Sequence, residues 1–560
     1  MKNRKLLHLL WLTIFFFISF ALSFMALEKF YGEESKSTLL HFQQPTEGSS
    51  FSLHLTSTNF ILESKEKPLS SDLTASKAKP ITIESQFFEV YQQQGRQKVL
   101  FGELLVDIGF LEPTLDSYYF LRYKPLQTLE EPLSLSLTID SSFDEVSLRY
   151  LTYDGDLTVE TSAWSTAVLL NDQEVLPRQS LFLDGHDFSA YLSLVYVYEP
   201  LGLGVRKERY DLLPPATYLD QGESKVITFH LPHQAGLEVE HWSLLGQKDL
   251  FLWDDEAQNA LRSTANLDRL RAWTREGVQA ITPPTYEPYD CRGFWVVPAH
   301  HVGNKLLLEG QDRFAKNMAL LSLDGALKTQ LPEGIWPTAP RSTWLYDSYG
   351  IEAGFFDSRF NSDAALFLLH GYRHYGKRDF LEGALRYADF LGQYARYHHR
   401  LTERGGYLVY DYFDYRNGHS EGRTISELSK CDRNQDRLDD WPYQPTVTSV
   451  SLNQLVTAMN FLYEIYEEEP NNSFLETAEI IRLAIQDIAS SWPQEKVKVD
   501  PTSMMDPYYG LFEHPLLTLH DLRYSQSLLE RREGQKDEAF QFLIEAAENY
   551  LEQIGLPSYS

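Results

Sequence analysis

The chain has 560 residues, which is too many for one ordinary hydrophobic core, so we expect about two to four domains. Hydrophobic residues make up 43% of it, which excludes a chain that is disordered throughout. The formal net charge of -29 excludes a polyanion-binding surface spread over the whole molecule, because phosphates would be repelled, and we expect no nucleic-acid partner.

An apolar segment, Leu6–Leu27, follows a short basic tail, residues 1–5. At roughly 1.5 Å per residue this segment would form a helix about 33 Å long, enough to cross a bilayer. The basic tail places the N-terminus in the cytoplasm. We therefore expect a single-pass signal anchor in the cell membrane, with the main domains extracytoplasmic. Residues 21–23 have the small-x-small pattern of a cleavage site, so secretion after cleavage is the alternative.

The middle of the chain has the composition of a spacer followed by strands. Residues 28–84 are rich in Ser, Thr, Lys, Glu and Gln and predict a polar spacer that is partly extended. Within residues 85–253, apolar and polar side chains alternate over 133–139, 146–150 and 192–198, as half-buried strands require. Short alternating runs separated by turns predict an antiparallel β-sandwich or barrel.

Residues 254–560 have helical periodicity instead. Apolar side chains recur at i, i+3, i+4 and i+7 over 381–395 and 452–466, and Ser473–Glu476 has the pattern of a capping box. A tetratricopeptide-type solenoid would show a fixed repeat near 34 residues, and the chain has none. The very unequal loops favour an α/α toroid, so the predicted fold class is α+β: an N-terminal transmembrane helix, a β-sandwich or barrel, and a C-terminal (α/α) toroid.

Three segments of this helical region concentrate aromatic and polar side chains: residues 344–361, 405–419 and 441–455. Each lies at or near the end of a predicted loop, and long loops commonly carry function. In a toroid such segments meet at the mouth of one funnel.

These segments resemble the C-terminal domain of D-glucuronyl C5-epimerases, over roughly Glu352 to Tyr466. The resemblance is carried by Tyr410-Asp411 with Arg416, by Trp441-Pro442-Tyr443-Gln444, by Asn453-Gln454-Leu455, and by Glu352 near the position of the family's catalytic glutamate. It departs from the family in the displaced Arg416 and in Gln444, which stands where the family has His. The resemblance implies an α/α toroid that inverts C5 of a uronate within a polysaccharide, without a cofactor.

The chemistry of that reaction suggests roles for individual residues. Removing the C5 proton needs a base on one face, an acid on the other, and a cation near the uronate carboxylate. A Tyr base needs an adjacent cation, because its ordinary pKa is about 10. We therefore predict a site on this end of the toroid. Its catalytic residues are Glu352, Tyr410, Tyr443 and Arg416, and its substrate-binding residues are Arg359, Tyr349, Asp411, Tyr415, Asn453 and Trp441.

Two other functions stay open. A glycoside hydrolase on the same scaffold needs two facing carboxyl groups, for which Glu352, Asp357, Asp411, Asp414 and Glu421 are candidates. A noncatalytic glycan-binding envelope protein would use the aromatic rim for stacking on sugars.

We assign no metal. Residues 432–436 have the oxygen spacing of a calcium loop, but Arg437 stands where such a loop needs Gly. The two cysteines, Cys291 and Cys431, are too few for a disulfide framework.

Overall fold

The chain forms two compact units. The β-rich unit comprises Met1–Tyr150, Ser165–Val197 and Asp211–Lys248, and the helical unit comprises Leu151–Trp164, Tyr198–Tyr210 and Asp249–Ser560. The computed structural model describes residues 35–42, 50–57, 60–64, 84–94, 97–111, 114, 116–129, 133–141, 145–153, 162–169, 174–202, 205–212, 215–265, 271–281, 286–287, 293–298, 300–338, 341–342, 345, 349, 351, 354–414, 448–493, 508–509 and 514–556.

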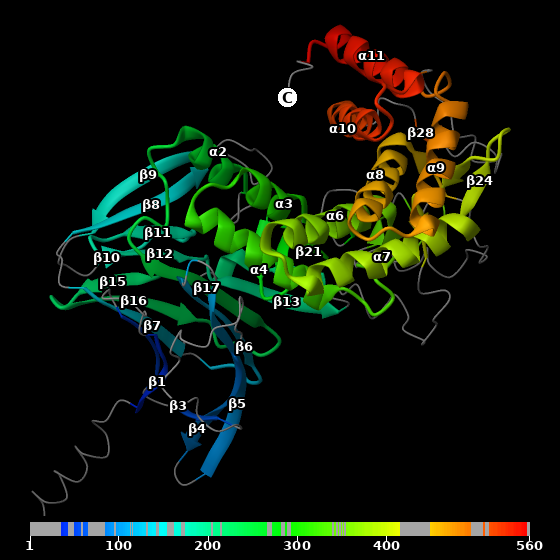
Figure 1. Cartoon of the computed structure of the whole chain (residues 1–560). Helices are drawn as coiled ribbons and strands as arrows, with labels where there is room; N and C mark the ends of the chain where they lie inside the picture. The colour runs from blue at the N-terminus through cyan, green and yellow to red at the C-terminus, as the bar shows by residue number, and fades with distance from the viewer. Residues whose placement is uncertain are drawn as a thin grey trace, which may run out of the picture. The chain divides into compact units, whose positions relative to one another are not determined.

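One sheet of the β-rich unit has six strands in the order β1-β2-β7-β16-β15-β10 (Figure 1). Its strands are β1 (Ser35–Phe42), β2 (Phe51–Ser57), β7 (Leu133–Asp140), β16 (Ser224–Leu231), β15 (Thr217–Asp220) and β10 (Glu174–Val175). Along β7 and β16 buried and half-buried residues alternate, and Leu133 lies opposite Leu231 in the antiparallel register. The period-2 pattern of the sequence therefore gives this sheet one apolar face.

A second sheet follows the path β3-β4-β5-β6-β17-β12-β11-β8-β9. The end of β8 and the start of β9 fall in Leu151–Trp164, which is assigned to the helical unit. Its strands are β3 (Phe60–Ser64), β4 (Glu84–Gln94), β5 (Gln97–Leu111), β6 (Asp116–Pro125), β17 (Glu238–Gln247), β12 (Phe188–Leu192), β11 (Leu181–Asp184), β8 (Val146–Tyr153) and β9 (Ser162–Leu169).

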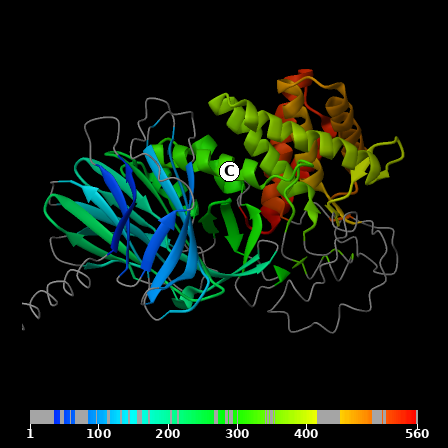
Figure 2. The same ribbon diagram turned by 90° about the horizontal axis from the view of Figure 1, so that it is seen from below.

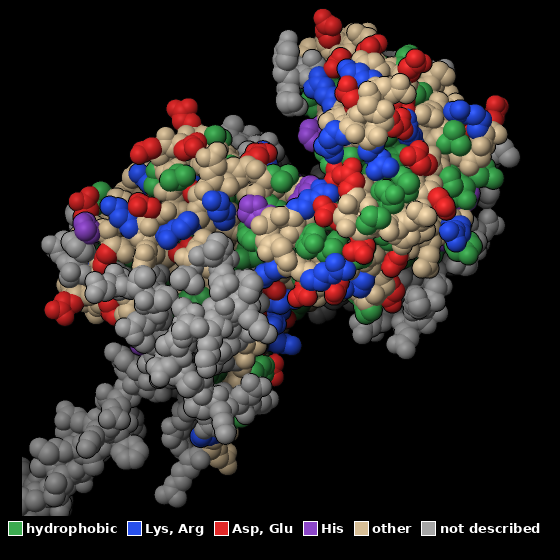
Figure 3. Space-filling model, in the orientation of Figure 1, with side chains coloured by type: hydrophobic (Ala, Val, Ile, Leu, Met, Phe, Trp, Pro, Cys, Tyr) green, Lys and Arg blue, Asp and Glu red, His purple; other side chains and the backbone are tan. Residues whose placement is uncertain are grey.

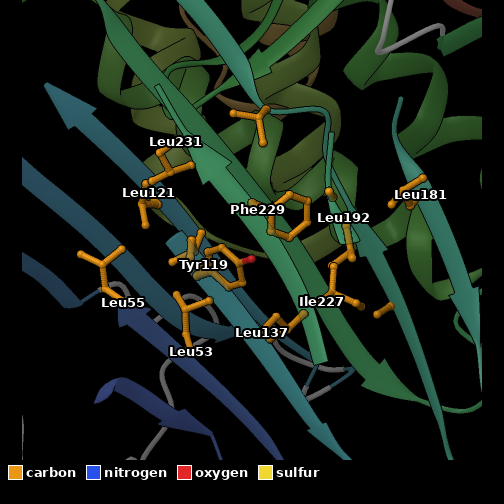
Figure 4. Packing of buried hydrophobic residues seen from close by; sticks show 14 of the residues in the cluster. Leu53, Leu55, Tyr119, Leu121, Leu137, Leu181, Leu192, Ile227, Phe229 and Leu231 are labelled. Carbon is orange, nitrogen blue, oxygen red and sulfur yellow. The ribbon is translucent and has the colours of Figure 1, made fainter. Parts of the chain in front are cut away.

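The two sheets share one hydrophobic core, as in a β-sandwich. Figure 4 shows side chains from the first sheet, such as Leu53, Leu137 and Phe229, packed against Tyr119 and Leu121 from the second. Strands β1 to β3 lie within residues 28–84, where a polar spacer was expected. The alternation of Phe51, Leu53 and Leu55, all buried, explains why this segment joins the sheet.

The helical unit contains a small antiparallel set of strands, β13-β14-β21-β19-β18. Their bounds are β13 (Tyr196–Gly202), β14 (Val205–Glu208), β21 (Gly293–Pro298), β19 (Gly277–Ile281) and β18 (Arg271–Thr274). Short two-stranded pairs join its loops: β20 (Tyr286–Glu287) with β22 (Arg341–Ser342), β23 (Phe356–Asp357) with β26 (Tyr412–Phe413), β24 (His399–Leu401) with β25 (Tyr407–Val409), and β27 (Val450–Ser451) with β28 (Tyr508–Tyr509).

After α2 (Glu256–Ala265), the helices that the structure describes in this unit form four hairpins (Figures 1 and 2). The hairpins are α3 (His300–Glu309) with α4 (Arg313–Thr329), α6 (Ser358–Tyr375) with α7 (Arg378–Tyr397), α8 (Leu452–Glu468) with α9 (Asn472–Asp487), and α10 (Pro515–Glu533) with α11 (Glu538–Gln553). The first helices contact one another in the order α3, α6, α8, α10, and the second helices in the order α4, α7, α9, α11. The hairpins therefore build two helical layers, the arrangement expected of an α/α fold. Among the described helices no substantial contact joins α10 to α3, so these four hairpins form an arc.

Capping residues explain where several helices begin and end. Asp537 accepts hydrogen bonds from the first turn of α11, Pro515 opens α10, and Gly376 and Gly534 end α6 and α10 with positive φ angles of 68° and 75°. The predicted capping box at Ser473 is displaced by two residues, because the side chain of Asn471 caps α9 instead.

The transmembrane part of the predicted fold class needs correction. No helix in the part of the chain that the structure describes is long and apolar enough to cross a membrane. The segment to which that prediction referred, Leu6–Leu27, lies outside the described residues. The fold class is therefore α+β, with a β-rich N-terminal unit and a helical C-terminal unit.

Candidate active site at the N-terminal ends of the first helices

The connections of the helical unit differ strongly in length between its two ends. Within each hairpin the turn is short: residues 310–312, 376–377, 469–471 and 534–537. From one hairpin to the next the connections are long: residues 330–357, 398–451 and 488–514. All the long connections lead to the N-terminal ends of α6, α8 and α10. Long loops on a packed scaffold commonly carry function, so this end, here called the long-loop end, is where a site is expected.

Asp357 lies at the start of α6 and is 3% exposed. Its Oδ1 accepts hydrogen bonds from the backbone N–H groups of Arg359, at 2.8 Å, and Phe360, at 3.0 Å. These bonds satisfy two of the donors that every helix start leaves free, which explains why α6 begins here. The preceding strand β23 pairs with β26, so that Asp357 lies opposite Tyr412.

Asp411, 1% exposed, is held beside this helix start by its backbone and its side chain. Its carbonyl oxygen accepts from the N–H of Ser358 at 2.9 Å, and its own N–H donates to the carbonyl of Ser449 at 2.8 Å. Its Oδ1 accepts from the N–H of Ser451 at 3.0 Å. The hydroxyl of Tyr394 donates to the carbonyl on either side of Asp411, those of residues 410 and 412. The segment is thus fixed at every peptide group, and it brings a second buried carboxyl group next to Asp357.

Both carboxyl groups bind protons more tightly than usual. Burial raises the pKa of Asp357 to about 7, against the opposing effect of its two N–H donors. Burial also raises the pKa of Asp411 well above its usual range, and the nearby charge of Asp357 adds to this effect. The hydroxyls of Ser449 and Ser451 face Asp411 and lower its pKa, but neither forms a hydrogen bond with its buried Oδ2 in the described structure. The pair therefore retains a proton near neutral pH, which ordinary aspartates do not.

Arg359 joins three helices at the same end. Its Nε donates to Asp363 at 3.0 Å, Nη2 to Asp521 of α10 at 3.3 Å, and Nη1 to Asp521 and to the carbonyl of Asn453 of α8. Burial opposes its charge, but the charges of Asp363 and Asp521 raise its pKa above the usual range. The guanidinium is thus engaged with two protein carboxylates rather than presented to an anionic ligand.

Other described charged residues of the helical unit include ion pairs on its surface. Figure 3 shows acidic and basic side chains interspersed on its visible face. Several form ion pairs, such as Arg373 with Glu468 and Arg523 with Glu548. Among the described residues, no group of three or more His, Cys, Asp or Glu side chains is arranged to hold a metal ion.

The structure describes five of the ten predicted site residues. Arg359, Asp411 and Asn453 meet at the long-loop end, and Tyr410 adjoins Asp411 there, with its N–H donating to the carbonyl of His398. Tyr349 is 8% exposed and lies in a small hydrophobic cluster with Leu345, Ile351 and Phe355, against Tyr412.

The other five, Glu352, Tyr443, Arg416, Tyr415 and Trp441, lie outside the described residues, as do Glu421, both cysteines and residues 432–436.

Several important residues of this end were not singled out from the sequence. Asp363 lies four residues after Arg359 in α6, where helical spacing brings the two side chains to the same face. Gln454 lies in the Asn453-Gln454-Leu455 motif, where the sequence indicates no separate role for it. Asp521 lies 162 residues from Arg359 in sequence, and no local pattern indicates that contact.

No family model matches the chain, and no curated protein matches it. Among solved structures, D-mannose isomerase matches with a TM-score of 0.28 and 12% identity, over 46% of this chain and 58% of its own. A sugar epimerase from a ruminal bacterium matches with a TM-score of 0.28 and 12% identity, over 45% of this chain and 58% of its own. A family 76 glycoside hydrolase from a bovine Bacteroides thetaiotaomicron strain has a TM-score of 0.33 and 11% identity, over 76% of this chain and 77% of its own.

All three of these proteins are sugar-processing enzymes by their descriptions, and this chain spans less than two thirds of the first two. At such TM-scores and identities the likeness does not assign a function to this chain.

Proposed function

We propose that this protein is a carbohydrate-active enzyme whose site lies at the long-loop end of the helical unit, with Asp357 and Asp411 as its acid and base groups. The observation that carries the proposal is the juxtaposition of two buried carboxyl groups, of which one has a pKa of about 7. A carboxyl group in that range both gives and takes a proton near neutral pH, as acid–base catalysis requires.

Among carbohydrate reactions, this pair best suits hydrolysis of a glycosidic bond. In that reaction a carboxylic acid protonates the glycosidic oxygen as its bond to the anomeric carbon breaks, and a carboxylate takes a proton from the attacking water or attacks the carbon itself. Both roles need carboxyl groups with different proton affinities, and neither needs a cation.

Epimerisation at C5 of a uronate is the second candidate. It is favoured by Tyr410, Asp411 and Asn453, which all lie at the long-loop end. The resemblance to the C5-epimerases rests in part on these three residues. It needs a cation for the uronate carboxylate. Arg359 is paired with Asp363 and Asp521, so another basic residue would have to serve.

The test is incubation of the full chain with neutral and uronate-containing polysaccharides in deuterated water. New reducing ends without deuterium at C5 support hydrolysis. Deuterium at C5 without chain cleavage supports epimerisation instead. Binding of a glycan without either product would contradict the proposal that the protein is an enzyme and would favour the glycan-binding alternative.

Substitution of the two aspartates tests their assignment. We expect Asp357→Asn and Asp411→Asn each to lower kcat by about 100-fold or more, the usual contribution of an acid–base group. Asn retains the capping oxygen, so α6 should still form.

The matched control is Asp537→Asn. Asp537 is also a buried N-cap aspartate, but it lies at the short-turn end of the helical unit, where it pairs with Arg482. The Asp537→Asn substitution should lower the free energy of unfolding and leave kcat unchanged. If Asp537→Asn and Asp357→Asn lower kcat equally, the assignment of Asp357 is contradicted.

A further inference from the structure

Gln454, in the first turn of α8, has a side-chain amide whose orientation is fixed from both ends. The residue is 6% exposed. Its Oε1 accepts hydrogen bonds from the hydroxyl of Ser358 at 2.5 Å and from the N–H of Arg359 at 3.2 Å. Its Nε2 donates to the hydroxyl of Tyr412 at 3.1 Å. The neutral amide offers both an acceptor and a donor in these directions, whereas an ionised carboxylate could only accept.

These contacts place Gln454 between the two carboxyl groups of the proposed site. The N–H of Arg359 is shared, because it donates to Oδ1 of Asp357 at 2.8 Å and to Oε1 of Gln454 at 3.2 Å. The Gln454 amide and the Asp357 carboxyl group are therefore direct neighbours. On its other side, Gln454 bonds to Tyr412, which follows Asp411 in the chain and lies opposite Asp357 in the β23–β26 pair.

We propose that Gln454 is a positioning residue, whose amide links the start of α6 to β26 and so sets the separation and orientation of the Asp357 and Asp411 carboxyl groups. This inference rests on the proposed function. Gln454 bonds to a helix start on one side and to a strand residue on the other. The backbone bond from Ser358 to Asp411 remains without it, so its removal would take away the side-chain link between the two segments and loosen the relative orientation of their carboxyl groups. A displacement of about 1 Å at a reacting group can lower a rate by about 100-fold.

The neutrality of the amide matters as well as its shape. Asp357 is already surrounded by charged and titratable groups from three elements: Arg359 and Asp363 of α6, Asp411 beside β26, and Tyr387 and Tyr394 of α7. From α8 its described neighbour is the uncharged Gln454. A carboxylate at position 454 would add a negative charge beside Asp357, disfavour its ionised form and raise its pKa further.

The experiment uses two substitutions in the full chain. In Gln454→Met the side chain keeps its bulk and loses all three hydrogen bonds, so we expect kcat to fall between about 10-fold and 100-fold with KM little changed. In Gln454→Glu the shape is kept, and we expect the pH midpoint of kcat that is due to Asp357 to move to higher pH. The same midpoint is followed without substrate by NMR of 13C-labelled aspartate, in which the signal lost in Asp357→Asn identifies the group.

Gln526→Glu is the matched control. Gln526 of α10 is also buried, and its amide forms two hydrogen bonds of 3.0 Å with the backbone of the N-cap residue Asp537, at the short-turn end. This variant should lose stability without a change in the Asp357 midpoint or in kcat. The proposal is overturned if Gln454→Glu leaves the midpoint where it is in the wild type, or if Gln454→Met lowers kcat no more than Gln526→Glu does.

The two proposals fail in different ways. If the wild-type chain has no activity on any glycan, the proposed function fails. The NMR titration still decides whether Gln454 controls the Asp357 carboxyl group, because it needs no substrate.

Discussion

At the scale of single residues, Asp357 combines a structural task with an unusual proton affinity. Its carboxyl group caps α6 and must therefore be buried beside two backbone N–H groups. Those donors stabilise the ionised form, but burial has the larger and opposite effect, so the pKa rises to about 7. An exposed N-cap aspartate would have the same hydrogen bonds without this shift. The proton affinity is thus a property of the packing around the cap.

This balance makes stability depend on pH. The pKa of Asp357 is raised from 3.8 to about 7 on folding, so its stabilising contribution is complete below pH 3.8 and is lost as pH rises through about 7. Over that window the free energy of unfolding of the wild type should fall, relative to Asp357→Asn, by on the order of 4 kcal/mol. Urea unfolding of both proteins at several pH values measures the difference. A difference that stays constant with pH would show that Asp357 titrates normally.

At the scale of elements, the hairpin β24–β25 supports the segment that carries Asp411. Its turn is held on α9 by Thr402 and Arg404, which both bond to Asp487. Gly406 lies directly against this helix: a Cβ added there would be 2.3 Å from the backbone nitrogen of Ala484. Because β25 leads straight into residues 410–412, the position of this hairpin determines where Asp411 lies.

We therefore expect Gly406→Ala to destabilise the protein by about 1–3 kcal/mol, because the new methyl group overlaps helix backbone that cannot move aside. Gly392→Ala is the control. Gly392 lies within α7 with nothing within 4 Å of an added Cβ, so the same change should stabilise by about 0.5–1 kcal/mol. Denaturant unfolding of both variants measures whether their free energies of unfolding change in opposite directions. If Gly406→Ala left the free energy of unfolding unchanged, the hairpin would be free to shift away from α9.

At the scale of the whole molecule, the chain does not divide into units by a single cut. The helical unit includes Leu151–Trp164 and Tyr198–Tyr210, which come from within the N-terminal half of the sequence. Arg206, 7% exposed, pairs with Glu276 at 2.9 Å and lies over the ring of Tyr198, and β14 pairs with β21. Strands from early in the chain are thus part of the helical unit.

A fragment of residues 249–560 should consequently be less stable than the same unit in the full chain. It lacks β13 and β14, so it leaves an edge of β21 without its partner strand and Glu276 without Arg206. We expect the helical transition, followed by circular dichroism, to occur at a lower urea concentration in the fragment. Arg206→Ala in the full chain should reproduce part of the loss. Identical transitions in fragment and full chain would contradict this account.

The sequence by itself determined the type of most elements, because the period of apolar side chains is a local property. Alternation over 133–139 and 146–150 correctly predicted β7 and β8, and the 3.6-residue period over 381–395 and 452–466 correctly predicted α7 and α8. The unequal loops also indicated the end of the helical unit at which polar groups gather. The alternation over 192–198 was a poorer guide, because these residues are divided between the end of β12 and the start of β13.

Only the tertiary structure decided which polar residues form the candidate site and what state they are in. Asp357, Asp411, Gln454 and Asp521 are far apart in sequence, and their contacts arise from the packing of α6, α8 and α10 rather than from any local pattern. The pairing of Arg359 with two carboxylates removes a cation that the sequence offered for substrate binding. The raised pKa values have the same origin, because the cost of an ionised carboxyl group depends on how much water the surrounding fold excludes.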